Sequence, residues 1–253
     1  MVEKVASTGE TAAGARRRRC DARDNRDKIA AAARRRFRAE GLDASLNQIA
    51  RDAGVSIGTL YNHFPTREAL IEDALMELVV ASGRSAEEAL RAADPWTGLV
   101  DHLTTLAQWQ ASDRGFTDIC VYSLPADSPI EVAKQRGHTL FQRLVTRAQE
   151  AGRLRSDITE ADLGLLLWSV VRATDGVRDV APGAWRRHLA VLLDGLRAEA
   201  AHPLPGRALD PEQVRAAMTL GGRAIDRRGS AGGGSAGGDS AVTSEDPEHS
   251  SPR

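Results

Sequence analysis

The spacing of apolar residues predicts helices throughout the central part of the chain. Ile29, Ala33 and Phe37 recur every four residues, which places them on one face of a helix over residues 25–40. Gly41 follows as a helix stop. Runs that alternate apolar and polar residues, as half-buried strands do, are absent, and so are hairpin signals. The pattern therefore predicts an all-α protein.

Similar apolar repeats, or a proline close to a helix start, indicate the remaining helices. Proline is well tolerated in the first turn, because the N–H that it lacks has no partner within the helix. Pro95, Pro129 and Pro182 occupy such positions. The expected ranges are 45–53, 56–64, 67 to the early eighties, 95–112, 128–151, 159–179 and 184–200, with a weaker helix after Asp210.

Residues 45–64 contain the most informative pattern. Ser45 can cap the first of two short helices, and Ser56 can cap the second. Between them lies Gly54, and glycine adopts the left-handed conformation of a sharp turn without a steric penalty. Two short helices joined by such a turn form a helix-turn-helix. Their inward faces would consist of Leu46, Ile49, Ala50 and Ala53 on the first helix and Leu60 and Phe64 on the second.

In such a unit the start of the second helix enters the major groove of DNA and reaches the base edges. Ile57 lies off the inward face, and its side chain suits contact with a thymine methyl group. Tyr61 and His63 carry hydrogen-bond donors that suit contacts with phosphates. The residues expected at the base edges are Ser56, Ile57, Gly58 and Thr59.

The run IARDAGVSIGTLYNHFPTREAL, residues 49–70, resembles the TetR family signature almost residue for residue. The resemblance extends over residues 25–75. It implies an all-α fold in which a three-helix head binds DNA and a fourth helix links this head to a helical-bundle regulatory and dimerisation domain. Members of the family usually repress transcription from near-palindromic operators, and their regulatory domains bind small molecules.

The resemblance also assigns DNA contacts to individual positions. Ser45 and Asn47 match phosphate and base contacts of the second helix, although Ser45, like Ser56, can also be a simple cap. Arg67, where the family often has Lys, matches a phosphate contact at the start of the fourth helix. The complete set, with Gln48 and Asn62 as weaker members, is Ser45, Asn47, Gln48, Ser56, Ile57, Gly58, Thr59, Tyr61, Asn62, His63 and Arg67.

The regulatory domain resembles the family only in its helical architecture. Its aromatic and soft side chains can either fill the core or line an apolar pocket for a small-molecule effector. The candidate ligand contacts are Trp109, Phe116, Cys120, Tyr122 and Trp168. The expected segments are a disordered basic tail (1–23), the helix-turn-helix domain (24–84), the ligand-binding and dimerisation domain (85–200), a weakly helical segment (201–228) and a disordered tail (229–253).

The last two strong helices carry apolar residues over a wide arc, which favours partners on more than one side. Two such helices from each subunit would form a four-helix interface, and a homodimer would match a near-palindromic operator. A monomer core is the alternative. The two apolar bands are Leu163, Leu166, Leu167, Val170, Val171, Thr174 and Val177, and Leu189, Leu192, Leu193 and Leu196.

Charge and composition narrow the function classes. The formal net charge is -1, yet residues 16–40 hold eleven Lys or Arg and four Asp or Glu, which indicates a local anionic partner or a solvated tail. The two cysteines fit no metal spacing, and no signal-peptide core or run long enough to span a bilayer occurs, so we expect a cytoplasmic protein. No nucleophile motif, metal cluster or phosphate loop is present, so we expect neither catalysis nor a cofactor. The alternatives kept open are an enzyme on a helical scaffold and an architectural protein that coats DNA without regulation by ligand.

Overall fold

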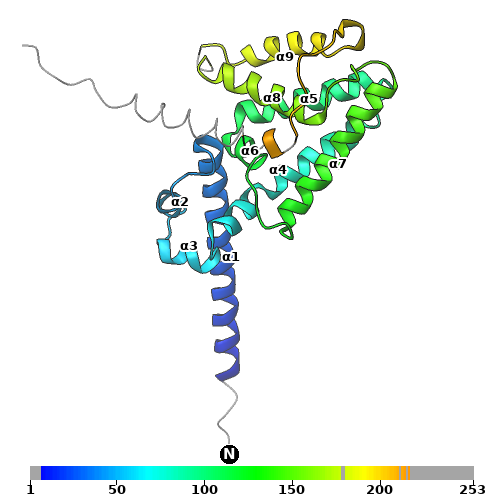
Figure 1. Ribbon diagram of the computed structural model, residues 1–253. Coiled ribbons are helices and arrows are strands. Elements are labelled where there is room, and N and C mark those ends of the chain that lie inside the picture. The colour runs from blue at the N-terminus through cyan, green and yellow to red at the C-terminus, as the bar shows by residue number, and fades with distance from the viewer. Residues whose placement is uncertain (1–6, 178–179, 211, 215, 217–253) are drawn as a thin grey trace, which may run out of the picture. The chain divides into compact units, whose positions relative to one another are not determined.

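The computed structural model describes residues 7–177, 180–210, 212–214 and 216, and the elements within these ranges are all helices (Figure 1). The predicted all-α class is confirmed. The helices are α1 (Ser7–Glu40), α2 (Leu46–Asp52), α3 (Ile57–His63), α4 (Arg67–Ala89), α5 (Pro95–Ser112), α6 (Arg114–Ile119), α7 (Pro129–Glu150), α8 (Glu160–Asp175), α9 (Ala184–Gly195) and the short 3-10 helix η1 (Ala198–Ala200).

The first helix is longer than its apolar pattern predicts. α1 begins at Ser7 rather than near residue 25, so the prediction of a disordered tail over residues 1–23 is wrong from Ser7 onward. Residues 7–24 contain no proline and are rich in Ala and Arg, which are strong helix formers. A helix that is already packed also extends readily, because each added residue gains a hydrogen bond without a new nucleation step. Residues 1–6 lie outside the described residues.

Other helix boundaries differ by local causes. α4 continues to Ala89, beyond the early eighties. The six-residue helix α6 was not predicted, because its pattern is too short to show a period. It starts where the Asp113 side chain accepts a hydrogen bond from the Phe116 N–H at 2.9 Å. In the C-terminal segment expected to be weakly helical, residues 201–210 are irregular and 212–214 are helical, whereas residues 217–253 lie outside the described residues.

The helix-turn-helix segment rests on a core formed by α1 to α4. Ile29, Ala33 and Phe37 are fully buried there, as their spacing predicts. The same core also takes in Phe116 and Ile119 of α6, and further residues up to the start of α7. The packing of the DNA-binding head is therefore continuous with residues beyond the expected boundary at residue 84.

A second core joins the carboxyl-terminal half of α4 to α5, α7, α8 and α9. α4 packs more extensively against α7 than against any other helix (Figure 1). Most of the two apolar bands predicted for dimerisation point into this core of the same chain: Leu163, Leu167, Val170, Val171, Thr174, Leu189, Leu193 and Leu196 are buried.

Candidate DNA interface and effector cavity

α2 and α3 form the predicted helix-turn-helix, and Gly54 shapes its turn. Gly54 has a φ of 69°, the left-handed conformation expected of it. Its N–H donates to the Arg51 carbonyl at 3.0 Å, and the Val55 N–H donates to the Ala50 carbonyl at 3.0 Å, which satisfies the carbonyls at the end of α2. Leu60 then holds α3 against the core, with only 1% of its surface exposed.

One face of α3 presents the predicted DNA contacts to solvent. Ile57 and Tyr61 lie one helical turn apart and are 36% and 48% exposed, which is high for large apolar side chains. Gly58 and Asn62, the next pair along the same turn, are also exposed. The remaining two predicted contacts on α3, Thr59 and His63, are half-buried. The bare backbone at Gly58 permits close approach to a groove, with exposed larger side chains on either side of it.

The two serines predicted as caps or contacts differ in the structure. The Ser56 hydroxyl accepts the Thr59 N–H at 3.1 Å and lies 2.9 Å from the Thr59 hydroxyl, so it caps α3. Ser45 occupies the same position before α2 but makes no side-chain cap bond. It is exposed together with Asn47, and Gln48 is half-buried beside them. Of the two serines, only Ser56 therefore uses its hydroxyl to cap a helix.

Arg67 has protein partners at the position predicted for a phosphate contact. Its guanidinium donates to the carbonyls of Leu42 and Ala44, the second at 3.0 Å, and thereby ties the start of α4 to the loop before α2. On the other side of the head, Arg26 donates to the His63 carbonyl at 3.2 Å and pairs with Asp73 at 2.5 Å. These two arginines fix both ends of the helix-turn-helix to α1 and α4.

The loop that Arg67 holds is also bonded to α6. The Leu42 N–H donates to the Asp118 carboxylate at 2.8 Å. Arg34 of α1 pairs with Asp113 at the start of α6, and Gly115 packs so close to Phe37 that a Cβ would lie 3.0 Å from the Phe37 carbonyl oxygen. Helix α6 is therefore joined to the head by two carboxylates and a glycine contact.

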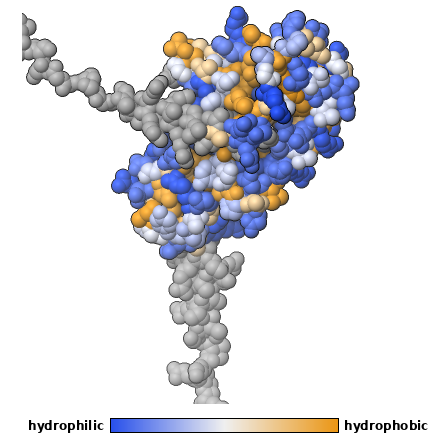
Figure 2. Space-filling view, in the orientation of Figure 1, coloured by the Kyte–Doolittle hydropathy of each residue, from blue (hydrophilic) through white to orange (hydrophobic). Residues whose placement is uncertain are grey.

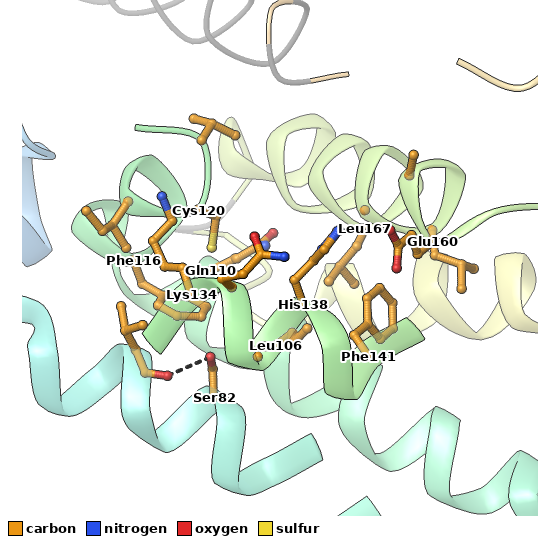
Figure 3. A pocket seen from close by; sticks show the side chains of 18 of the residues that line it. Ser82, Leu106, Gln110, Phe116, Cys120, Lys134, His138, Phe141, Glu160 and Leu167 are labelled. Atoms are coloured by element: carbon orange, nitrogen blue, oxygen red, sulfur yellow. Dashed lines mark hydrogen bonds and ion pairs between the residues drawn. The ribbon is translucent and has the colours of Figure 1, made fainter. Parts of the chain in front are cut away.

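A cavity of about 300 Å³ adjoins α6 and is lined mainly by residues of α4, α5, α6, α7 and α8 (Figure 3). Phe116 and Cys120, two of the five predicted ligand contacts, line it. Trp109, Tyr122 and Trp168 do not. Trp109 and Tyr122 pack instead against the core of the head, and Trp109 meets the Phe116 ring edge-on at 5.6 Å. Residue type alone does not tell which aromatic side chains face a cavity, because core and cavity walls use the same residues.

Several polar residues of the cavity were not predicted. Gln110 follows Leu99, Leu103 and Leu106 at helical spacing. A polar amide on an otherwise apolar helix face could therefore have indicated a polar position in a cavity. Gln110 is 6% exposed, and its side-chain oxygen is buried without a hydrogen-bond partner among the described residues. Glu160, the first residue of α8, carried no such signal. Its Oε1 accepts from His138 at 2.8 Å and from Gln142 at 2.9 Å, whereas its buried Oε2 has no partner within the described ranges.

Other titratable groups of the cavity are satisfied or neutral. Lys134 donates to Glu131 at 3.0 Å and to the Tyr122 carbonyl at 2.6 Å. Burial lowers the pKa of His102 to about 4, so its ring is neutral near pH 7, where it lies 3.1 Å from the Ser85 hydroxyl. Cys120 lines the cavity and part of the residue is exposed. Desolvation by the surrounding protein raises the pKa of the Cys120 thiol to about 11. The thiol is therefore protonated near pH 7 and is not a thiolate nucleophile.

The described part of the chain contains neither a candidate metal site nor a candidate membrane-spanning helix. Within it, no group of three or more His, Cys, Asp or Glu side chains is arranged to hold a metal ion. None of its helices combines the length and the apolar character needed to cross a membrane.

The chain is similar in sequence to known proteins. A sequence model for bacterial regulatory proteins of the tetR family matches residues 29–74, and one for the C-terminal domain of SbtR-like transcriptional regulators matches residues 94–198. A solved TetR transcriptional regulator from Streptomyces coelicolor is 36% identical, over 68% of this chain and 98% of that one, with a TM-score of 0.46. A TetR transcription regulatory protein from Mycobacterium vanbaalenii is 33% identical, over 71% and 98%, with a TM-score of 0.42. No curated protein matches the chain.

The exposed α3, which is the recognition helix of the helix-turn-helix, and the matching head sequence define a helix-turn-helix regulator of transcription. The chain belongs to the TetR family.

The unpartnered amide of Gln110 leads to a stability prediction. Gln110→Leu removes a buried oxygen that has no hydrogen-bond partner in the described part of the chain, so we expect the free energy of unfolding to rise by about 1 kcal/mol. Gln149→Leu is the matched control, because Gln149 donates to the carbonyls of Arg155 and Ile158 at 3.1 and 3.0 Å. Its loss should lower that free energy by about 1–3 kcal/mol. Urea unfolding followed by circular dichroism measures both changes, and equal destabilisation by the two variants would contradict the assignment.

Proposed function

We propose that the protein is a homodimeric repressor that binds a near-palindromic operator and leaves it when a small molecule enters the cavity. The observation that carries this proposal is the bonding of α6, whose residues line the cavity, to the Leu42 loop before α2. A ligand that moves α6 would thereby move the helix-turn-helix. An enzyme is less well supported, because the cavity contains neither an activated nucleophile nor a metal site among the described residues.

On the DNA side, we assign base contacts to Ile57, Gly58 and Thr59 at the start of α3, with Asn47 of α2 beside them. Ser45, Tyr61 and His63 are the candidates for phosphate contacts. Ser56 supports the helix as its cap, and Arg67 positions the loop before α2 through the Leu42 and Ala44 carbonyls. Gln48 and Asn62 remain secondary candidates at the edge of this face.

The dimer proposal depends on apolar surface that the fold leaves uncovered. Val191 of α9 is 68% exposed and Val177, just after α8, is 45% exposed, whereas Leu166 and Leu192 are only partly buried. Apolar surface is visible over this part of the molecule at the top of Figure 2. A second copy would bury these side chains and place two recognition helices in successive major grooves, about 34–36 Å apart.

Val191→Glu should therefore prevent self-association, since a buried unpaired carboxylate at an interface is costly. We expect sedimentation at micromolar concentration to give a dimer for the unaltered protein and a monomer for this variant. Val132→Glu, at a position of α7 that is 58% exposed, is the control and should remain dimeric. A monomeric unaltered protein, bound singly to the asymmetric DNA fragments that genome-wide selection recovers, would refute the dimer.

Base and phosphate contacts should respond differently to substitution. Thr59→Ala should change the preferred base at its contact position by about 1–3 kcal/mol. Tyr61→Phe removes only a hydroxyl and should weaken binding by about 1 kcal/mol, evenly across operator variants. Competition binding over all single-base variants of the selected operator measures both effects. If Thr59→Ala weakened binding equally for all operator variants, the assignment of Thr59 as a base contact would be wrong.

A covalent substitute for the ligand tests the coupling. Gly164 of α8 lines the cavity, and a Cβ there meets no atom within 4 Å. We expect Gly164→Phe to occupy the cavity and to weaken operator binding by about 5–150-fold, the usual range of allosteric coupling. Asp118→Ala, which removes the acceptor for the Leu42 N–H, should diminish this effect in the double variant.

The control for this experiment is Val132→Phe, at an exposed position of α7 that does not line the cavity. It should leave the operator affinity unchanged. If Gly164→Phe bound the operator as tightly as Val132→Phe does, with both variants folded by circular dichroism, the proposed regulation would fail.

A further inference from the structure

Two side chains of the cavity carry oxygens that no donor among the described residues satisfies. They are Gln110 of α5 and Glu160 of α8, and both are among the residues shown around the cavity in Figure 3. Gln110 is only 6% exposed, and the Glu160 side chain is only 9% exposed. Buried polar atoms in native proteins are almost always hydrogen-bonded, so two exceptions in one cavity indicate groups kept for a ligand.

The charges around the cavity determine which polar group a ligand can offer. Lys134 is already bonded to Glu131 and to the Tyr122 carbonyl, and it is therefore not a free cation awaiting an anion. His102 is uncharged near pH 7, since burial lowers its pKa to about 4. Glu160 shares its Oε1 with His138 and Gln142, which leaves Oε2 as an unsatisfied acceptor. The described lining thus favours a donor and disfavours a second carboxylate.

The size and the remaining surface of the cavity limit the rest of the ligand. A volume of about 300 Å³ lies at the lower end of the range for small-molecule sites, about 300–1,000 Å³. The lining also contains apolar side chains, among them Leu106, Phe141 and Leu167. A space of this volume suits a compact apolar body.

We propose that the cavity binds compact, largely apolar molecules bearing a hydroxyl or ammonium group, which donates a hydrogen bond to Oε2 of Glu160, with the Gln110 amide as a second polar contact. Carboxylic acids are excluded, because a ligand carboxylate beside Oε2 would place two like charges in a buried site. The assignment rests on the proposed function only in placing the effector in this cavity; it concerns which chemistry the cavity accepts.

The test compares four probes that share one benzyl or phenyl body. Benzyl alcohol and benzylamine carry a donor, methyl benzyl ether carries only an acceptor, and benzoate carries an anion. We expect calorimetry with the full chain at neutral pH to show both donor probes bound at least about tenfold more tightly than the ether or benzoate, as one hydrogen bond to a charged acceptor provides. The ratio between benzylamine and benzyl alcohol shows whether ammonium or hydroxyl is preferred.

Glu160→Gln turns the unsatisfied acceptor into a donor while its oxygen can still accept from His138 and Gln142. We expect this variant to lose the preference for donor probes and to gain affinity for benzoate and the ether. Glu150→Gln, an equal charge change at an exposed position at the end of α7, should leave the ranking unchanged. Thermal unfolding of both variants confirms that they are folded.

Three results would overturn the proposal: no binding of either donor probe at millimolar concentration, equal or tighter binding of benzoate, or an unchanged ranking in Glu160→Gln. Release of operator DNA is measured separately. A donor probe that binds with the expected preference but leaves the operator complex intact would refute the proposed regulation and leave the ligand class standing.

Discussion

The backbone of Leu42 is the point on which the arrangement of the head depends. Its N–H is held by Asp118 of α6 and its carbonyl by Arg67 of α4, so one residue of the loop before α2 is fixed from two directions. The loop begins at Gly41, which has a φ of 84° and no room for a Cβ, because Asp118 lies against it. Isolated hydrogen bonds contribute little, but a bond whose loss leaves a buried group unsatisfied is costly to break. The orientation of the recognition helix is therefore tied to the position of α6.

This constraint is reinforced by packing. Phe116 and Ile119 of α6 are buried in the core of the head and also line the cavity. Close-packed interiors deform little, so a displacement of α6 is passed to its neighbours instead of being absorbed. The Arg34–Asp113 pair and the Gly115–Phe37 contact add two further connections to α1. In this geometry α6 reaches the head directly, in parallel with the longer path through α4.

The cavity contains polar groups that destabilise the fold, in contrast to the close packing around α6. Gln110 and Glu160 each keep a polar atom buried without a partner in the described structure, a state that lowers the free energy of unfolding. Apolar residues at these positions would form a more stable core. Functional sites commonly retain such unfavourable features, because the groups that destabilise the free protein are those that recognise the ligand.

The sequence by itself determined the helix-turn-helix, since its signals are local: Gly54 for the turn, Ser56 for the cap, and the period that leaves Ile57 and Tyr61 on the outer face. A helical period assigns each residue to a face without reference to the rest of the chain. Only the tertiary structure decided the partners of Arg67, the bond between Asp118 and Leu42, and the walls of the cavity. These features join residues distant in sequence, and the same aromatic side chain can serve a core or a cavity. Residue type therefore could not separate the predicted contacts that line the cavity, Phe116 and Cys120, from Trp109 and Tyr122, which pack against the core of the head.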